Sequence, residues 1–313
     1  MNTAESTLYP ALEPFAQQQL PVGGGHAIHF EQCGNPGGFP AIFLHGGPGS
    51  HTQPLHRRFF DPQFYRIVLC DQRGCGRSVP LGCTEENTTR HLVEDIEALR
   101  ERLGFERVML FGGSWGATLA LAYAAAHPQR VAAMVLRGVF LGTRGEVDWY
   151  LGGLGRLVPQ AWQALAPGES GDLLARYHAL VNQHDEAAAR AAAQRWVGYE
   201  QAVMSLDAGG GAGGAADPAA ALARARVQLH YLVHDCFLEP GEFVSSLTRL
   251  GKTQVLIVQG QRDQVCPPRA ALELAERLPR AELRLIERGG HSAAEPAMAQ
   301  ALRGAADDLR RLL

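Results

Sequence analysis

Short apolar runs alternate with helical patterns in the first and last parts of the chain, and this alternation limits the fold more than any other feature. The predicted elements are strands at 41–44, 66–70, 108–111, 133–136, 255–258 and 283–286, and helices at 92–103, 116–126, 269–278 and 296–313. Strands that are apolar along nearly their whole length and are separated by helices are typical of a parallel sheet covered on both faces. We therefore expect an α/β fold with a mostly parallel central sheet.

The middle of the chain has a different character. Between 142 and 247 the apolar strands disappear, and Ala, Leu, Arg and Gln recur at helical spacing. We predict one α/β body built from 1–141 and 248–313, with residues 142–247 inserted as a helical cap. Within the insertion, the Gly- and Ala-rich run 208–221 is predicted to be a mobile loop that neither caps a helix nor fills a core.

Composition excludes several classes of function. The chain has 313 residues, 46% of them hydrophobic, and a formal net charge of −3, so it lacks the basic surplus of nucleic-acid-binding proteins. The longest apolar run, 117–126, is about half of the ~20 residues that cross a bilayer. The N-terminal sequence does not resemble a secretory signal, which favours the cytoplasm. Six cysteines without a C-x-x-C pair predict free thiols and no metal site.

A candidate nucleophile lies between a predicted strand and a predicted helix. The sequence GGSWG at 112–116 has the G-x-S-x-G pattern, with Ser114 at its centre. In a nucleophile elbow the turn is so tight that only glycines fit at the flanking positions, and the serine is held strained with its hydroxyl exposed. A second glycine-rich sequence, HGGPG at 45–49, follows the strand at 41–44. Its backbone N–H groups and that of Trp115 are candidates to form an oxyanion hole.

A serine needs a base and an acid that orients the base, and both follow later in the chain. Asp263 comes after the strand at 255–258, and His291 lies in the sequence GGHS after the strand at 283–286. The order Ser114, Asp263, His291 is that of α/β-hydrolases. Asp71 is a competing acid, but it precedes the serine and is followed by Arg73, so we interpret it as part of a structural ion pair.

These residues resemble the proline iminopeptidases, also called prolyl aminopeptidases, a group of α/β-hydrolases. The resemblance rests on FLHGGPG at 43–49, DQRGCGRS at 71–78, FGGSWG at 111–116, LRGVF at 136–140 and GGHS at 289–292. It implies removal of an N-terminal proline through an acyl-enzyme on Ser114, with His291 as base, Asp263 as its orienting acid, and no cofactor. It also implies that the N–H groups of Gly47 and Trp115 form the oxyanion hole.

The resemblance extends less well to the cap, where the family binds the substrate imino group with acidic side chains. RWVGYE at 195–200 is similar to the family's W-x-x-W-E segment, which assigns Glu200 to that group. The family's A-R-I-E-N-H-Y-F is matched by ARVQLHYL at 225–232, so Gln228 stands where a carboxylate is expected. Asp235 is a candidate to supply the missing charge. Phe140, Phe237 and Cys266 fall at positions of the ring pocket.

Three hypotheses of different classes follow. The first is a serine aminopeptidase that acts on a small peptide or aminoacyl substrate with a free N-terminus. The second keeps the triad but acts as an amidase or esterase on other small aminoacyl or lactam compounds, and is motivated by Gln228. The third is a binding protein without catalysis. Turnover of prolyl anilides against esters separates the first two, and labelling of Ser114 by a serine-directed probe excludes the third.

Overall fold

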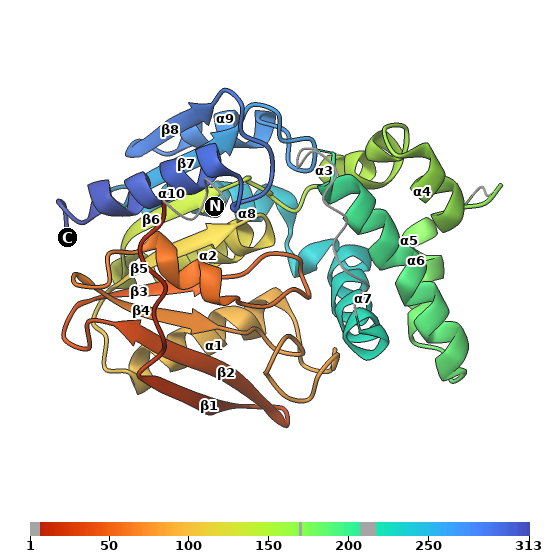
Figure 1. Ribbon diagram of the computed structural model, residues 1–313, viewed down its shortest axis with the longest axis horizontal. Coiled ribbons are helices and arrows are strands. Elements are labelled where there is room, and N and C mark those ends of the chain that lie inside the picture. Colours follow the sequence, from red (N-terminus) through yellow and green to blue (C-terminus); the bar gives the residue numbers. More distant parts are fainter. Residues whose placement is uncertain (1–6, 169–170, 207–216) are drawn as a thin grey trace.

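The computed structural model describes residues 7–168, 171–206 and 217–313. Within these residues the chain forms one eight-stranded sheet in the order β1-β2-β4-β3-β5-β6-β7-β8 (Figure 1). The strands are β1 (Ala16–Gly23), β2 (His26–Gly34), β3 (Phe39–Leu44), β4 (Tyr65–Cys70), β5 (Val108–Gly113), β6 (Val131–Arg137), β7 (Gln254–Gly260) and β8 (Ala281–Ile286). Strands β3 to β8 are parallel, so the predicted mostly parallel α/β sheet is confirmed.

Strands β1 and β2 form an antiparallel hairpin at one edge of the sheet, and β2 also pairs antiparallel with β4. The sequence prediction did not include this hairpin. Its first strand begins Ala-Gln-Gln-Gln, and most of its side chains are exposed or half-buried. An edge strand of this kind has no apolar run by which it could be recognised.

Helices cover both faces of the sheet. Successive side chains of a strand point to opposite sides, so a strand of apolar residues places apolar side chains on both faces, and both must be buried. In β3, Ile42 and Leu44 belong to one buried cluster and Ala41 and Phe43 to the other. The first cluster includes side chains of α1 (Thr89–Arg102), α2 (Trp115–Ala126) and α9 (Arg269–Arg277). The second includes α10 (Pro296–Leu309) and the short helix η1 (Pro54–Phe59). A further turn, η2 (Pro128–Arg130), precedes β6.

All of the elements between β6 and β7 are helical. They are α3 (Arg144–Asp148), the π-helical turn η3 (Trp149–Gly153), α4 (Pro159–Leu165), α5 (Leu173–Val181), α6 (Glu186–Met204), α7 (Pro218–Val233), η4 (Asp235–Phe237), α8 (Pro240–Ser246) and η5 (Leu247–Leu250). Figure 1 shows α4 to α7 grouped beside the sheet. Buried aromatic side chains hold this group together, for example Tyr177 of α5 against Trp196 of α6, with ring centroids 5.5 Å apart.

The predicted loop at 208–221 is partly wrong. Residues 208–216 lie outside the described residues. Asp217 caps α7, with its carboxylate accepting hydrogen bonds from the N–H groups of Ala219 and Ala220. Pro218 occupies the first turn, where a missing N–H has no cost. The C-terminal end of the run is therefore helical, and Ala221 is buried.

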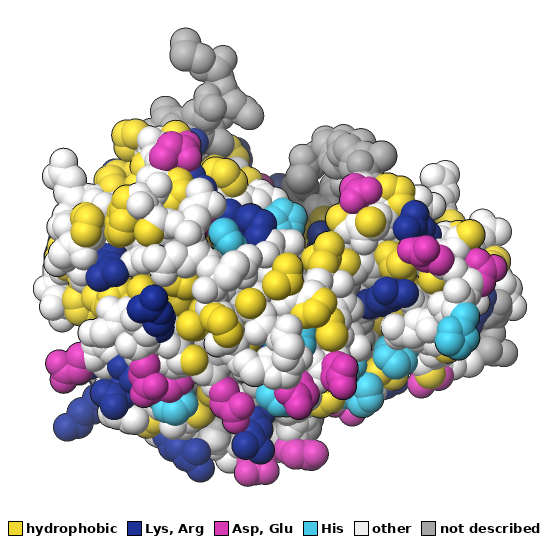
Figure 2. Space-filling view, turned by 90° about the horizontal axis from the view of Figure 1, so that it is seen from below, with side chains coloured by type: hydrophobic (Ala, Val, Ile, Leu, Met, Phe, Trp, Pro, Cys, Tyr) yellow, Lys and Arg dark blue, Asp and Glu magenta, His cyan; other side chains and the backbone are white. Residues whose placement is uncertain are grey.

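In Figure 2 basic and acidic side chains are interspersed over the visible face. Each of the six cysteines is a free thiol in the structure. Among the described helices, none is both long enough and apolar enough to cross a bilayer.

Candidate active site

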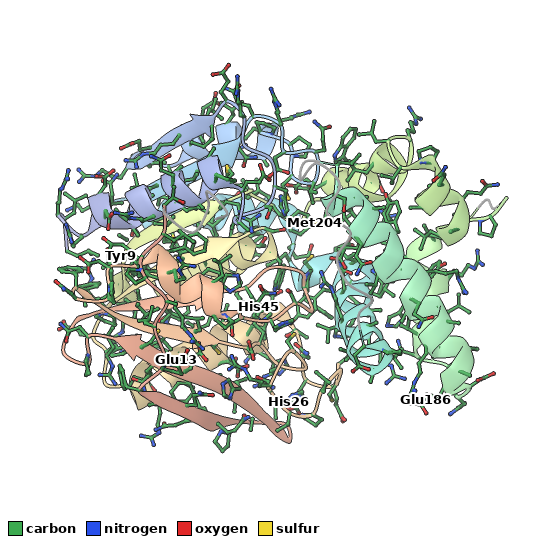
Figure 3. All side chains as sticks on the ribbon, in the orientation of Figure 1. Tyr9, Glu13, His26, His45, Glu186 and Met204 are labelled. Carbon is green, nitrogen blue, oxygen red and sulfur yellow. The ribbon has the colours of Figure 1, made fainter. Side chains whose placement is uncertain are left out.

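A cavity of about 310 Å³ lies where the sheet meets the helices between β6 and β7. Its lining includes residues from the ends of β3, β5 and β6 and from helices α6 and α7. In Figure 3, His45 from the end of β3 and Met204 from the end of α6 lie on opposite sides of this boundary. Ser114 and His291 both line the cavity. Loops that follow parallel strands meet at one edge of the sheet, where α/β folds place their sites.

Ser114 occupies the turn between β5 and α2 in a strained conformation, with φ 56° and ψ −125°. Positive φ is uncommon for a residue with a side chain and is characteristic of a nucleophile elbow. A Cβ at Gly112 would overlap the carbonyl oxygen of Gly116, and one at Gly116 would overlap that of Leu44. Only glycine fits at these two positions, for the steric reason that the sequence motif suggested.

His291 and Asp263 form a buried pair. The imidazole Nδ1 lies 2.9 Å from Oδ2 and 3.0 Å from Oδ1 of Asp263. The carboxylate is held in turn by the N–H of Cys266, at 2.8 Å, and by the Gln259 amide, at 3.3 Å. Gly138 packs against the pair, since a Cβ there would lie 3.0 Å from the imidazole Cε1. The orientation of the imidazole is therefore determined by several neighbours.

The Arg137 guanidinium contacts the other side of His291. It donates to the carbonyl oxygen of His291 at 2.7 Å and lies 3.1 Å from Nε2. Arginine only donates and carboxylate only accepts, so Nδ1 carries the proton toward Asp263 and Nε2 presents its lone pair. This tautomer is the one that accepts a serine proton. Sequence reasoning included Arg137 only as part of a motif and gave it no role.

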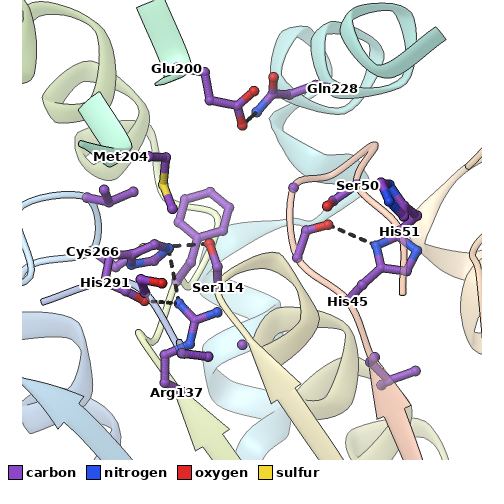
Figure 4. Close-up of a pocket in the computed structure, with 18 of the residues that line it drawn as sticks. His45, Ser50, His51, Ser114, Arg137, Glu200, Met204, Gln228, Cys266 and His291 are labelled. Atoms are coloured by element: carbon purple, nitrogen blue, oxygen red, sulfur yellow. Dashed lines mark hydrogen bonds between the residues drawn. The ribbon is translucent and has the colours of Figure 1, made fainter. Parts of the chain in front are cut away.

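In Figure 4 the side chains of Ser114 and His291 face one another across the floor of the cavity. Cys266 lies beside them, with its sulfur 3.9 Å from the Ser114 hydroxyl oxygen. Burial raises the pKa of the Cys266 thiol well above its usual range, so the thiol is neutral. The structure thus brings the three predicted triad residues and Cys266 together.

The two predicted oxyanion donors belong to neighbouring segments. Gly47 lines the cavity, and Trp115 is the first residue of α2, so its N–H has no partner inside the helix. Gln72 connects the segments: its Nε2 donates to the carbonyl oxygen of His45 at 2.8 Å, and its Oε1 accepts from the Trp115 indole at 2.9 Å. We call these two hydrogen bonds the Gln72 bridge. The bridge holds the glycine-rich loop against the elbow.

Asp71 is a structural residue, but not with the expected partner. Its carboxylate accepts from Arg77 at 3.0 Å and from Thr52 at 2.6 and 2.7 Å. Arg73 pairs instead with Asp95 at 2.7 Å. Burial opposes the charge on Asp71, but His45 and the donors on Thr52 and Arg77 hold its pKa below the usual range. The carboxylate therefore anchors the segment that follows the glycine-rich loop.

Glu200 and Gln228 lie at the end of the cavity away from Ser114 (Figure 4). The Gln228 amide nitrogen is 3.3 Å from Oε1 of Glu200. The same oxygen accepts from the Arg224 guanidinium at 2.7 Å, an ion pair that sequence reasoning missed. No local signal reveals this pair, because it forms only when α6 packs against α7.

Two of the three residues predicted for the ring pocket line the cavity. Phe140 and Cys266 line the cavity, together with Tyr150 and Met204, which the sequence analysis did not identify. Phe237 is not among the residues that line the cavity. The chain turns sharply at η4 through residues with positive φ, and the Phe237 ring stacks on His234, 5.0 Å away. Asp235 is exposed in the same turn and supplies no charge to the cavity.

Within the described ranges, no group of three or more His, Cys, Asp or Glu side chains is arranged to hold a metal ion.

A strained serine at a strand–helix elbow, an Asp–His pair on later loops and a mostly parallel sheet define an α/β-hydrolase. The family model described as "alpha/beta hydrolase fold" matches residues 40–296. The chain belongs, within this class, to the proline iminopeptidase family. It is 42% identical to a proline iminopeptidase of Neisseria gonorrhoeae, over 98% of this chain and 100% of that protein. A proline iminopeptidase of Xanthomonas citri is 44% identical, over 96% and 98%.

Solved structures support the same fold. A proline iminopeptidase-related protein from Thermus thermophilus aligns with a TM-score of 0.59 at 24% identity, covering 96% of this chain and 100% of the other. An esterase from Rhodococcus also gives a TM-score of 0.59, at 18% identity, covering 95% and 99%. At such low identity these structures speak to the fold alone.

Proposed function

We propose that the protein is a serine aminopeptidase that releases N-terminal proline from small peptides or aminoacyl compounds. The proposal rests on one observation: a strained serine, an imidazole paired with Asp263, and the buried carboxylate of Glu200 share one cavity. Ser114 and His291 lie at one end and Glu200 lies at the other. The two relatives named above support the same activity, because both are proline iminopeptidases and their sequences align with nearly the full length of this chain.

In the acylation step, Ser114 attacks the carbonyl carbon of the prolyl residue while Nε2 of His291 takes the hydroxyl proton. The Asp263 carboxylate stabilises the imidazolium that forms. The N–H groups of Gly47 and Trp115 hold the oxyanion of the tetrahedral intermediate. His291 then gives its proton to the leaving amine, and the peptide bond breaks.

Deacylation follows the same path with water as the nucleophile. His291 removes a proton from water, the hydroxide attacks the acyl carbon, and the serine oxygen leaves with the proton that His291 returns. The products are proline and free Ser114. Both steps start from the tautomer in which Nδ1 carries the proton, which is the arrangement that the contacts of Nδ1 with Asp263 and of Nε2 with Arg137 favour.

The cavity also explains selectivity for an N-terminal residue. Phe140, Val147 and Met204 give it an apolar wall that suits a pyrrolidine ring. Glu200, at the far end, is the group that meets the ring nitrogen. A chain that continued beyond that nitrogen would run into α6 and α7, so a blocked or internal proline fits poorly.

The test is a panel of prolyl anilide, alanyl anilide and simple alkyl esters, assayed with the wild type and Ser114→Ala. We expect preference for prolyl anilide, and a loss of about 10⁴-fold or more in kcat for Ser114→Ala. Ser245→Ala, which changes an exposed serine on α8, is the matched control. Esters turned over far faster than every prolyl amide, or Ser114→Ala activity within tenfold of wild type, would contradict the proposal.

A further inference from the structure

The carboxylate assigned to the substrate nitrogen is already paired with a cation. The Arg224 guanidinium donates to Oε1 of Glu200 at 2.7 Å, between α7 and α6. The Glu200 carboxylate raises the pKa of Arg224, so the guanidinium is charged. The two formal charges cancel, and this end of the cavity contributes no net negative charge.

Gln228 cannot replace the missing carboxylate as an acceptor. The Trp196 indole N–H lies 2.7 Å from Oε1 of Gln228. Because an indole nitrogen only donates, the amide oxygen must face Trp196 and the amide nitrogen must face Glu200. Gln228 therefore presents N–H to the cavity end, and it donates to the same Glu200 oxygen that binds Arg224.

Three buried polar atoms at this end have no hydrogen-bond partner among the residues that the structure describes. They are Oε2 of Glu200, Nε of Arg224 and the phenol oxygen of Tyr150. All three residues line the cavity. Buried polar atoms are normally paired, so an unpaired set in one cavity indicates a ligand that supplies the partners. The set contains one acceptor, one donor and one hydroxyl, which can act as either.

An ammonium group matches this set poorly. A protonated secondary amine has two N–H donors and no acceptor, so it could pair with Oε2 of Glu200 but not with Nε of Arg224. Its charge would also be repelled by the guanidinium, which favours loss of the proton. An uncharged secondary amine has one N–H and one lone pair, and a lactam has one N–H beside a carbonyl oxygen. Both supply a donor and an acceptor.

We propose that Arg224 determines specificity by selecting acyl groups whose ring nitrogen carries N–H but no charge, namely unprotonated prolyl and the five-membered lactam 5-oxoprolyl. The inference deepens the function proposed above and rests on it. The lactam N–H donates to Oε2 of Glu200, and the lactam carbonyl accepts from Arg224 or Tyr150. The apolar wall formed by Phe140, Val147 and Met204 serves either five-membered ring.

Cleavage of a 5-oxoprolyl substrate uses the same balanced steps. Ser114 attacks the exocyclic carbonyl, the bond to the leaving amine breaks, and that amine takes its proton from His291. Water then hydrolyses the ester and releases 5-oxoproline. The ring amide is not attacked, since its carbonyl lies at the Arg224 end of the cavity.

The experiment measures kcat/KM for prolyl anilide and 5-oxoprolyl anilide in the wild type, Arg224→Met and Arg226→Met. Arg226 is the matched control, because it lies on the same helix but donates to the Val181 carbonyl oxygen and does not line the cavity. A cyclopentanecarboxylate ester, which has the ring without nitrogen, reports the folding of each variant and the integrity of its triad. Prolyl anilide is also assayed across pH, through the range near 8 where terminal amines lose their proton.

In the wild type we expect 5-oxoprolyl turnover, and a rise in kcat/KM for prolyl anilide as its amine deprotonates. Arg224→Met should shift the ratio of prolyl to 5-oxoprolyl kcat/KM about tenfold to a hundredfold toward prolyl, the usual effect of one charge-assisted hydrogen bond. Arg226→Met should leave that ratio unchanged. Wild-type preference for protonated prolyl with no 5-oxoprolyl turnover, or an unchanged ratio in Arg224→Met, would overturn the inference. Failure of the wild type to cleave either anilide while it hydrolyses the ester would instead overturn the aminopeptidase function.

Discussion

Replacement of Gln72 by methionine tests whether the Gln72 bridge positions the oxyanion hole. Methionine has a similar length but neither donor nor acceptor at its end. The change leaves the His45 carbonyl oxygen and the Trp115 indole N–H buried without their present partners. The backbone hydrogen bond from Gln72 N–H to Nε2 of His45 remains, so the loop keeps one of its contacts.

The magnitude follows from the two groups that lose partners. A buried polar group without a partner costs about 1–3 kcal/mol, so the free energy of unfolding should fall by about 2–6 kcal/mol. Domains are commonly stable by about 5–15 kcal/mol, so a loss near the middle of the calculated range leaves the variant folded at 25 °C. Loss of one well-placed oxyanion donor typically lowers kcat about 10²–10³-fold. Because the bridge acts on the donors indirectly, we expect a loss between tenfold and that limit, with KM little changed.

The assay combines urea unfolding with steady-state kinetics on prolyl anilide. Tyr65→Phe is the matched control, because it removes a buried hydrogen bond from the Tyr65 hydroxyl to the Ala306 carbonyl oxygen, at the opposite end of the strands from the cavity. It should lower the free energy of unfolding with no loss of kcat. If Gln72→Met is destabilised as calculated but keeps wild-type kcat, the bridge contributes to stability alone and the positioning argument is wrong.

Three further changes test other parts of the structure. Asp263→Asn should lower kcat about 10⁴-fold with an unchanged circular dichroism spectrum, because the amide can donate to Nδ1 and disfavour the required tautomer; activity within a hundredfold would contradict this. Gly116→Ala should fail to give soluble folded protein, since the new Cβ would overlap the Leu44 carbonyl oxygen; a wild-type melting temperature would refute the packing argument. Burial lowers the pKa of His56 to about 3, so unfolded chains bind a proton between pH 6.5 and 3 that folded chains do not. Relative to His56→Phe, the wild type should lose up to about 1.4 kcal/mol of stability per pH unit as the pH falls through that window. If the urea midpoints of the two proteins shift by the same amount between pH 7 and pH 5, this explanation is excluded.

The triad could be predicted because Ser114 directly follows β5, and Asp263 and His291 lie in the loops that follow β7 and β8. A buried parallel strand is visible in sequence, and the residue after it must reach the functional edge of the sheet. Ser114 also has flanking glycines that sterics require. The order of the serine, acid and histidine along the chain then separates this topology from other serine hydrolases.

The cavity end near Glu200 could not be predicted in the same way. Glu200 and Arg224 are 24 residues apart on two helices, and their contact depends on how those helices pack. Phe237 could not be placed from sequence because it lies in a sharp turn of three residues with positive φ, where its ring stacks on His234. The partner of Asp71 was wrong because Arg73 is nearer to it in sequence than Arg77, whereas the fold pairs Asp71 with Arg77 and Arg73 with Asp95.

The position of the helical insertion has an evolutionary consequence. It leaves the sheet at the C-terminal end of β6 and returns at the N-terminal end of β7, the neighbouring parallel strand, so it occupies a single crossover connection. Ser114, Asp263 and His291 are all encoded outside it. Mutations in α6 and α7 can therefore accumulate without replacing any of these three residues. A lineage could acquire a new substrate by exchanging or reshaping this one segment, and the amide at Gln228, where the family pattern has a carboxylate, is a change of the kind that such a history would leave.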